Sequence, residues 1–149
     1  MPLIPADAET LVDLGSGAGF PGLVLAILGG RGVELIEADS RKAAFLREAS
    51  RVTNADVTIR GCRIEAVAPH EADVVTARGC APLDRLLALS ERFIGQRTTC
   101  LFLKGMHTEE ELTTAGKAWR MSVSRHPSRA DPGGSVLLLQ QVVREPRGN

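Results

Sequence analysis

The chain has 149 residues, with 18 basic and 18 acidic side chains that leave no formal net charge at pH 7. This length corresponds to one domain with room for a real core, and a composition of 44% hydrophobic and 24% charged residues excludes disorder of the chain as a whole. The chain lacks the basic excess of a dedicated duplex-binding protein. A net charge of zero does not exclude a protein that docks on one RNA site through a local patch.

Short apolar runs alternate with helical stretches from the start of the chain. The predicted strands cover 10–15, 33–38, 57–60, 72–77, 98–104, 119–125 and 135–143, and the predicted helices cover 20–28, 41–52, 82–91 and 108–115. Strands that alternate with helices at this spacing predict βαβ units and a mostly parallel sheet. Only a segment of turn composition, 127–134, separates the last two strands, which predicts an antiparallel hairpin at one edge. The predicted fold class is therefore α/β and Rossmann-like.

The predicted helix 41–52 shows the local signals behind these assignments. Its apolar residues Ala44, Phe45, Ala49 and Val52 have helical spacing. Asp39 or Ser40 stands where a residue would cap the helix N-terminus.

Cysteines, histidines and hydropathy narrow the class of protein further. Cys62, Cys80 and Cys100 are far apart and form no CxxC pair, which is typical of reduced thiols used as small core residues in a cytosolic protein. The three histidines are equally scattered, so we expect no metal site. The N-terminus lacks the basic segment of a signal peptide, and the longest apolar stretch, 23–28, is too short to span a bilayer. We expect a cytoplasmic protein without membrane contact.

The strongest signal is the glycine-rich segment 12–22, VDLGSGAGFPG, between a predicted strand and a predicted helix. Glycine lets the backbone turn tightly and approach a ligand closely. A strand, a tight turn and a helix in this order present backbone N–H groups to a ligand. Gly17, Gly19 and Gly22 also satisfy the dinucleotide pattern G-x-G-x-x-G. The segment therefore predicts a nucleotide-containing cofactor.

Two features favour S-adenosylmethionine over a nicotinamide dinucleotide. Asp13 stands two residues before Gly15, which gives the D-x-G-x-G-x-G form typical of S-adenosylmethionine enzymes. The strand–helix units then end in an apparent hairpin, which resembles the topology of class I methyltransferases. Glu37, at the end of the second predicted strand, does not separate the two cofactors, because either would place its ribose there.

Several segments in one order carry a family resemblance. They are 13–23 (DLGSGAGFPGL), 37–46 (EADSRKAAFL), 63–65 (RIE), 76–78 (TAR) and 103–105 (LKG). Together they resemble the bacterial glucose-inhibited division protein B family, the small-subunit rRNA guanine-N7 methyltransferases, over nearly the whole chain. The resemblance implies methyl transfer from S-adenosylmethionine to N7 of a guanine in 16S rRNA. It also implies 16S rRNA or the small ribosomal subunit as the partner, and we expect the protein to be a monomer.

The resemblance further implies roles for individual residues. Arg78 would face the cofactor and substrate cleft, Lys104 would lie near the RNA, and these two would be the catalytic residues. The residues implied to bind the cofactor are Asp13, Gly15, Gly17, Phe20, Glu37 (on the ribose hydroxyls), Ile64 and Glu65 (beside the adenine) and Arg78. These residues cluster near the carboxyl ends of predicted strands, where ligands bind in open α/β sheets.

The expected chemistry limits what the cationic residues would do. Guanine N7 carries a lone pair and no proton at neutral pH, so the enzyme mainly has to position N7 against the methyl group. Positive charge moves from sulfur to the base, and a fixed cation very near N7 would oppose that movement. We therefore expect Arg78 and Lys104 to hold phosphate, guanine O6 or the cofactor carboxylate at some distance from N7. Arg63 is a further candidate for a phosphate contact.

Other interpretations stay open at this point. Arg63 or Arg78 could pair with a nearby carboxylate, Lys104 could be a solvated strand end, and 41–42 (RK) could be helix-surface charge. The chain could also be a methyltransferase for a small molecule or a protein, because fold alone does not set the substrate. A nicotinamide dehydrogenase and a cofactor-binding fragment without activity are the remaining alternatives.

Two departures from the family pattern are visible. The family carries an N-terminal helical segment before the glycine loop, whereas this chain begins almost at the loop. We therefore expect a single methyltransferase domain over 1–149 without that segment. The family also often has Ser before the Arg-Ala of the fourth strand, where this chain has the run 76–81, TARGCA.

Overall fold

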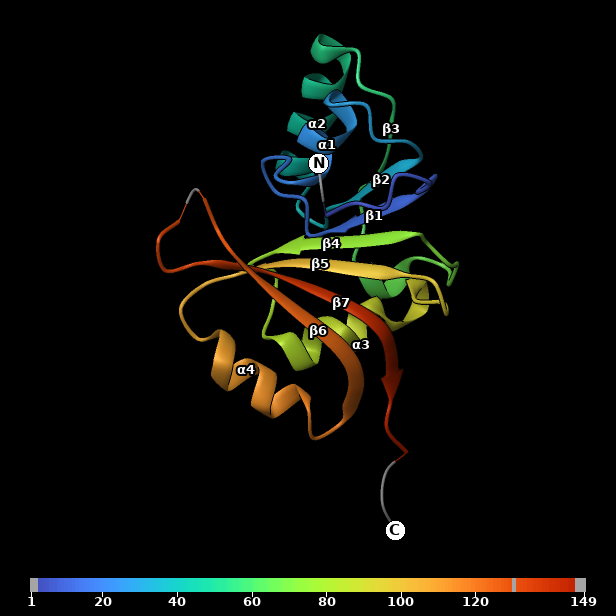
Figure 1. Cartoon of the computed structure of the whole chain (residues 1–149). Helices are drawn as coiled ribbons and strands as arrows, with labels where there is room; N and C mark the ends of the chain where they lie inside the picture. The colour runs from blue at the N-terminus through green and yellow to red at the C-terminus, as the bar shows by residue number, and fades with distance from the viewer. Residues whose placement is uncertain (1–2, 130, 147–149) are drawn as a thin grey trace.

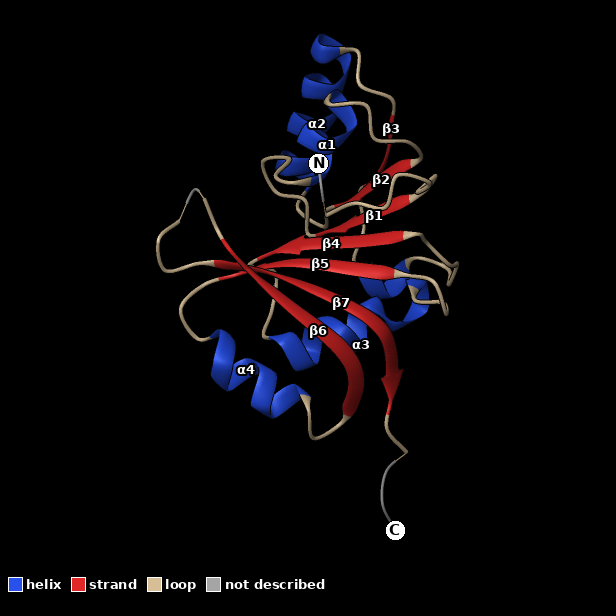
Figure 2. Cartoon of the chain, in the orientation of Figure 1, coloured by secondary structure: helices blue, strands red, loops and turns tan. Residues whose placement is uncertain are grey.

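The computed structural model describes residues 3–129 and 131–146, and the two ends of the predicted 1–149 domain lie outside these residues. Within them, seven strands form one sheet in the order β3–β2–β1–β4–β5–β7–β6 (Figures 1 and 2). The strands are Leu11–Leu14 (β1), Val33–Ile36 (β2), Val57–Arg60 (β3), Val74–Arg78 (β4), Thr99–Lys104 (β5), Trp119–Pro127 (β6) and Ser135–Arg144 (β7). Strands β1 to β5 pair in parallel, which confirms the predicted mostly parallel α/β sheet.

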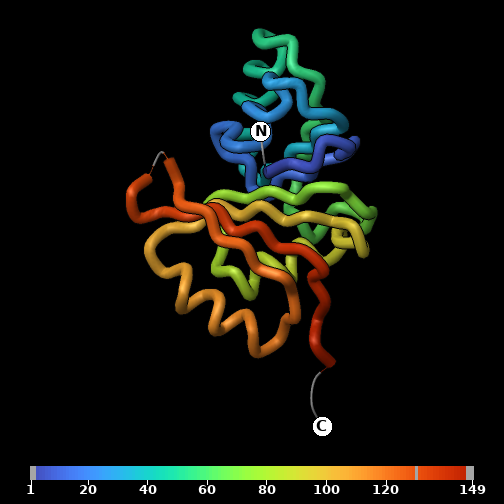
Figure 3. The backbone as a smooth tube through the Cα atoms, viewed as in Figure 1, coloured from blue at the N-terminus to red at the C-terminus, as the bar shows by residue number. Residues whose placement is uncertain are grey.

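The predicted antiparallel hairpin is also confirmed, with one refinement in its order. β7 pairs antiparallel with both β5 and β6, so the last strand of the chain lies inside the sheet and β6 forms the edge. Ser135 pairs with Lys104 on one side and with Pro127 on the other, so the turn between β6 and β7 lies at the carboxyl end of β5. In Figure 3 this turn lies on the same side of the molecule as the loops that follow β1, β4 and β5.

Four α-helices and two 3-10 turns connect the strands of the described part. They are Gly22–Ile27 (α1), Ser40–Thr53 (α2), Ile64–Ala66 (η1), Leu83–Ser90 (α3), Glu91–Phe93 (η2) and Thr108–Ala115 (α4). α1 is shorter than the predicted 20–28 because Gly15, Gly17 and Gly19 take positive φ angles and keep the backbone in a turn before the helix. No helix within the described ranges is long and apolar enough to cross a bilayer.

Each face of the sheet has its own core. Leu11, Leu35 and Val74 pack with residues of α1 and α2 on one face, whereas Val12 and Phe102 pack with residues of α3 and α4 on the other. Figure 1 shows these helix pairs on opposite sides of the sheet. Successive residues of β1 thus reach opposite faces, and both are buried, as expected for the central strand of a parallel sheet.

α2 begins as predicted but buries a different face. Asp39 is its N-cap, and its carboxylate accepts hydrogen bonds from the backbone N–H groups of Arg41 and Lys42. The helix buries Ala43 and Leu46, whereas Phe45 and Val52 are 53% and 68% exposed. The apolar spacing that predicts the helix therefore does not mark its buried side, because contacts with α1 and β3 decide which side packs.

Candidate functional site

The glycine loop after β1 rests on a buried carboxylate. Asp13 is fully buried beneath the loop, and its Oδ1 accepts a hydrogen bond of 2.6 Å from the Thr76 hydroxyl. Burial raises the pKa of Asp13 to about 6, although the hydrogen bond from Thr76 opposes the shift. A Cβ on Gly22 would lie 2.5 Å from Asp13 Oδ2 and 2.5 Å from a methyl of Leu35. Glycine is thus required where α1 crosses close to β1 and β2.

Glu37 ties the end of β2 to the same loop. Its Oε1 accepts a hydrogen bond of 2.7 Å from the Gly17 N–H, and its Oε2 accepts one of 2.9 Å from the Asp39 N–H. The Glu37 side chain is largely buried. It therefore fixes the glycine loop against α2 and keeps a carboxylate at the carboxyl end of β2.

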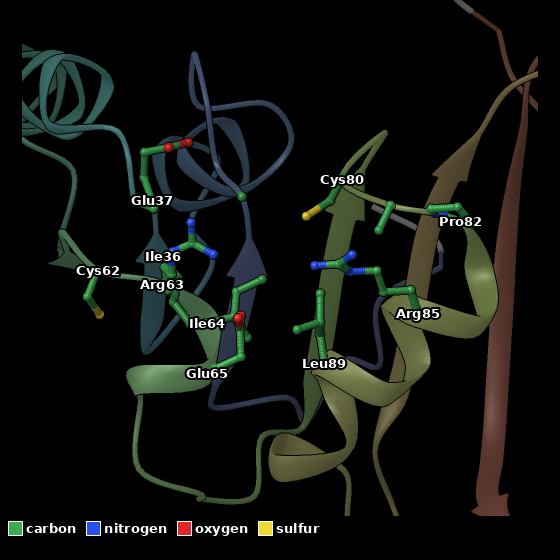
Figure 4. A pocket seen from close by; sticks show the side chains of 13 residues that line it. Ile36, Glu37, Cys62, Arg63, Ile64, Glu65, Cys80, Pro82, Arg85 and Leu89 are labelled. Carbon is green, nitrogen blue, oxygen red and sulfur yellow. The ribbon is translucent and has the colours of Figure 1, made fainter.

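A pocket of about 330 Å³ opens beside the glycine loop, and we call it the loop pocket. Its lining residues are Gly15, Ile36, Glu37, Ala38, Cys62, Arg63, Ile64, Glu65, Cys80, Ala81, Pro82, Arg85 and Leu89. Figure 4 shows residues from the ends of β2 and β3 facing residues of α3 and the turn before it across this pocket. Its volume and its mixture of apolar and charged side chains are within the usual range for a small-molecule site.

A second pocket of about 500 Å³ lies next to it, and we call it the hairpin pocket because the β6–β7 turn forms one wall. Its lining residues are Phe20, Pro21, Val24, Leu25, Arg78, Gly79, Leu103, Lys104, Gly105, Ser128, Asp131, Gly134 and Ser135. Gly79 lines the hairpin pocket and Cys80 lines the loop pocket, so one short turn separates the two. A Cβ on Gly15 would lie 2.9 Å from Cys80 Sγ, which shows how closely the glycine loop approaches this turn.

The structure divides the predicted site residues between these pockets. Gly15, Glu37, Ile64 and Glu65 line the loop pocket, and the predicted candidate Arg63 lies beside them. Among the other candidates, Phe20, Arg78 and Lys104 line the hairpin pocket. Asp13 and Gly17 line neither of these two pockets, because one is buried beneath the glycine loop and the other donates its N–H to Glu37.

The cationic side chains differ in their partners. Lys104 is not a solvated strand end, because its side chain is only 5% exposed and its Nζ lies 2.9 Å from Glu111 Oε1. The Arg78 guanidinium lies 6.0 Å from the centre of the Phe20 ring. Across the described residues, Arg63, Arg78 and Arg85 form no ion pair, so a structural pairing with a carboxylate does not explain them.

Sequence patterns did not predict two features of the loop pocket. Arg85 and Leu89 reach the loop pocket from α3, but apolar spacing does not show which side of a short helix lies over a site. Cys80 is exposed at the mouth of the loop pocket, so the expectation of three small core cysteines is wrong at this position, whereas Cys100 is buried. The described ranges hold no cluster of three or more His, Cys, Asp or Glu side chains placed to bind a metal.

Comparisons with known proteins find close relatives over most of the chain. A family model described as rRNA small subunit methyltransferase G matches residues 1–131. Ribosomal RNA small subunit methyltransferase G of Paramagnetospirillum magneticum is 58% identical over 143 residues, which are 96% of this chain and 70% of the relative. The protein of the same name from Gluconobacter oxydans is 51% identical over 142 residues, which are 95% of this chain and 73% of the relative.

Solved structures show the same fold at much lower identity. A mutant of MtNAS in complex with S-adenosylmethionine has a TM-score of 0.72 at 17% identity and matches 90% of this chain and 55% of its own. M. jannaschii TYW2 in complex with AdoMet has a TM-score of 0.69 at 18% identity and matches 96% of this chain and 72% of its own. Identities this low show a shared fold and leave the substrate open.

Proposed function

The chain belongs to the rRNA small subunit methyltransferase G family, and we propose that it transfers a methyl group from S-adenosylmethionine to N7 of a guanine in 16S rRNA. The observation that carries the proposal is the meeting of two pockets across the turn 79–80, at the carboxyl ends of β1 and β4. One pocket would hold the cofactor and the other the base, with the transferred group at their boundary.

The loop pocket has the features that S-adenosylmethionine needs. Glu37 offers a carboxylate for the ribose hydroxyls, and Ile64 offers an apolar surface for the adenine. Gly15, with φ +62°, keeps the loop backbone open where a Cβ would collide with Cys80. When bound, S-adenosylmethionine supplies a methyl group on a positively charged sulfur. The chain's own residues have to hold this group still and exclude water.

The hairpin pocket suits a base that needs no proton removed. Phe20 and Arg78 offer an aromatic ring and a guanidinium plane, and both kinds of surface stack on unpaired RNA bases. N7 of guanine already carries a lone pair, so we assign no general base. We propose that Arg78 binds O6 of the guanine or a neighbouring phosphate and keeps N7 in line with the methyl group.

An unpaired guanidinium in the hairpin pocket supports RNA over a small molecule as the substrate. Arg78 lines this pocket without an ion pair among the described residues, whereas Arg63 and Arg85 share the loop pocket with the carboxylates of Glu37 and Glu65. The Arg78 guanidinium would therefore attract a phosphate to the hairpin pocket. We further propose a cytoplasmic monomer that acts on 16S rRNA or on the small ribosomal subunit.

Isothermal titration followed by a transfer assay tests this assignment. We expect S-adenosylmethionine to bind with a micromolar dissociation constant, and NADH, which shares only the adenosine part, not to bind. The chain should then transfer labelled methyl groups to 16S rRNA or to small ribosomal subunits. Binding of NADH alone would favour a dehydrogenase, and binding of S-adenosylmethionine without transfer to either RNA substrate would favour a different acceptor.

Replacing Arg78 should affect methyl transfer to the RNA without affecting cofactor binding. Arg78→Ala should lower kcat/KM for the RNA about a hundredfold, while the dissociation constant of S-adenosylmethionine stays close to that of the wild type, because Arg78 lines the hairpin pocket. The matched control is Arg31→Ala. Arg31 is exposed just before β2, at the amino ends of the parallel strands and so away from both pockets, and its replacement should leave transfer unchanged. Unchanged transfer by Arg78→Ala would remove Arg78 from the substrate site.

A further inference from the structure

An ion pair between the buried Lys104 and the half-buried Glu111 lies beside the two pockets. Lys104, at the end of β5, lines the hairpin pocket, and its Nζ lies 2.9 Å from Glu111 Oε1 on α4. The same Nζ donates a hydrogen bond of 2.7 Å to the carbonyl oxygen of Ala81, which lines the loop pocket. A single ammonium group therefore contacts the wall of one pocket while its side chain lines the other.

Glu111 holds the second end of the same turn. Its Oε1 also accepts a hydrogen bond of 2.8 Å from the backbone N–H of Leu83, the first residue of α3. Pro82, between the two anchored residues, has no N–H to donate. The turn 81–83 is thus fixed at its carbonyl by Lys104 and at its N–H by Glu111. Because Ala81 and Pro82 line the loop pocket, the pair sets the position of that wall.

The pair also affects the electrostatics of the proposed reaction. An unpaired ammonium at Lys104 would oppose the positive charge that moves onto the base during methyl transfer. The Glu111 carboxylate, 2.9 Å from the ammonium, cancels most of its field at distances larger than that separation. An ammonium group has three N–H donors, and the two contacts to Glu111 and Ala81 use two of them. Lys104 can thus still donate to a polar group in the hairpin pocket.

We propose that Glu111 is a positioning residue for methyl transfer, which acts with Lys104 to fix the turn 81–83 as a wall of the loop pocket and to neutralise the ammonium beside the hairpin pocket. The inference rests on the proposed function for the part that concerns the base. The part that concerns the wall requires only that the loop pocket binds S-adenosylmethionine.

The test compares Glu111→Gln with Glu110→Gln, a control on the same helix whose side chain is 82% exposed. Titration calorimetry gives the dissociation constant for S-adenosylmethionine, and steady-state assays give kcat and KM for the RNA. Glu111→Gln should weaken cofactor binding about tenfold and lower kcat about tenfold or more, with KM for the RNA nearly unchanged. Glu110→Gln should match the wild type in all three quantities.

A double variant separates positioning from folding. Lys104→Met combined with Glu111→Leu replaces the ion pair by apolar side chains, so no unpaired charge is left behind. We expect this variant to unfold cooperatively above the assay temperature, although at a lower temperature than the wild type, and to bind the cofactor weakly, because Ala81 O and the Leu83 N–H lose their partners. This variant also decides the question if Glu111→Gln does not fold.

Wild-type cofactor affinity and wild-type kcat in the folded variants would overturn the proposal and leave the pair with a purely structural role. The proposed function can fail independently. In that case the wild-type chain would bind S-adenosylmethionine without methylating 16S rRNA, and the comparison of dissociation constants would still test Glu111.

Discussion

Asp13 shows at the scale of a single residue how a motif can support a site without contacting its ligand. Its carboxyl is fully buried, one oxygen accepts from Thr76, and the other lies against Gly22 of α1. The geometry therefore assigns Asp13 to the support of the glycine loop. Asp13 does not line the loop pocket, and its direct contact with the cofactor stays a prediction.

The raised pKa of Asp13 makes stability depend on pH. The folded chain holds the proton up to about pH 6, whereas the pKa of an aspartate in water is 3.8. The stabilising contribution of the bound proton is therefore fully present below about pH 4 and is lost as the pH rises through about 6. Between pH 5 and pH 7.5 we expect wild type to lose about 1 kcal/mol of unfolding free energy relative to Asp13→Asn, which has no such proton.

Urea unfolding of both proteins at these two pH values measures the difference, and the comparison cancels the titration of groups that they share. A difference that does not change with pH would show that Asp13 is not the group responsible.

Site residues could be predicted where strand ends determine their position. Glu37, Ile64 and Glu65 follow β2 and β3, so their place at the carboxyl edge follows from the parallel sheet. The burial of Lys104 could not be predicted, because its partner Glu111 is on a later helix that sequence spacing does not orient. Phe20 follows the glycines but lies on the hairpin pocket, since the loop turns between Gly19 and α1.

At the scale of whole elements, order and type were predictable and packing was not. Alternating strands and helices leave few topologies, and each predicted strand is present, with α4 at its predicted bounds Thr108–Ala115. The buried side of α2 differs from its apolar spacing, because Phe45 lies outside while Ala43 and Leu46 pack inward. Contacts with α1 and β3 determine which side of α2 is buried, and the sequence of the helix by itself does not show these contacts.

The cap of α2 provides a direct check at this scale. Asp39→Ala should lower the free energy of unfolding by about 1 kcal/mol, because the N–H groups of Arg41 and Lys42 lose their acceptor. Ser40→Ala is the matched control, since Ser40 is the first residue of the helix and its side chain does not cap it. Equal effects of the two substitutions, measured by urea unfolding, would contradict the assignment of Asp39 as the cap.

For the whole molecule, net charge is a poor guide to the substrate. The 18 basic and 18 acidic residues cancel. Many of the acidic residues form ion pairs far from the pockets, as Glu91 does with Arg144 and Glu48 with Arg51, whereas Arg78 lines the hairpin pocket without an ion pair among the described residues. Only the fold shows where this unpaired charge lies.

Methyl transfer to N7 of guanine in 16S rRNA can be tested by locating the transferred methyl group. Small ribosomal subunits that lack the modification would be incubated with the chain and S-adenosylmethionine. The RNA would then be reduced with borohydride and treated with aniline, which cleaves the chain at N7-methylguanine. We predict cleavage at a single guanine that depends on the cofactor and is strongly reduced with Arg78→Ala. Methyl incorporation without cleavage, or incorporation only into another acceptor, would show that guanine N7 of 16S rRNA is not the methyl acceptor.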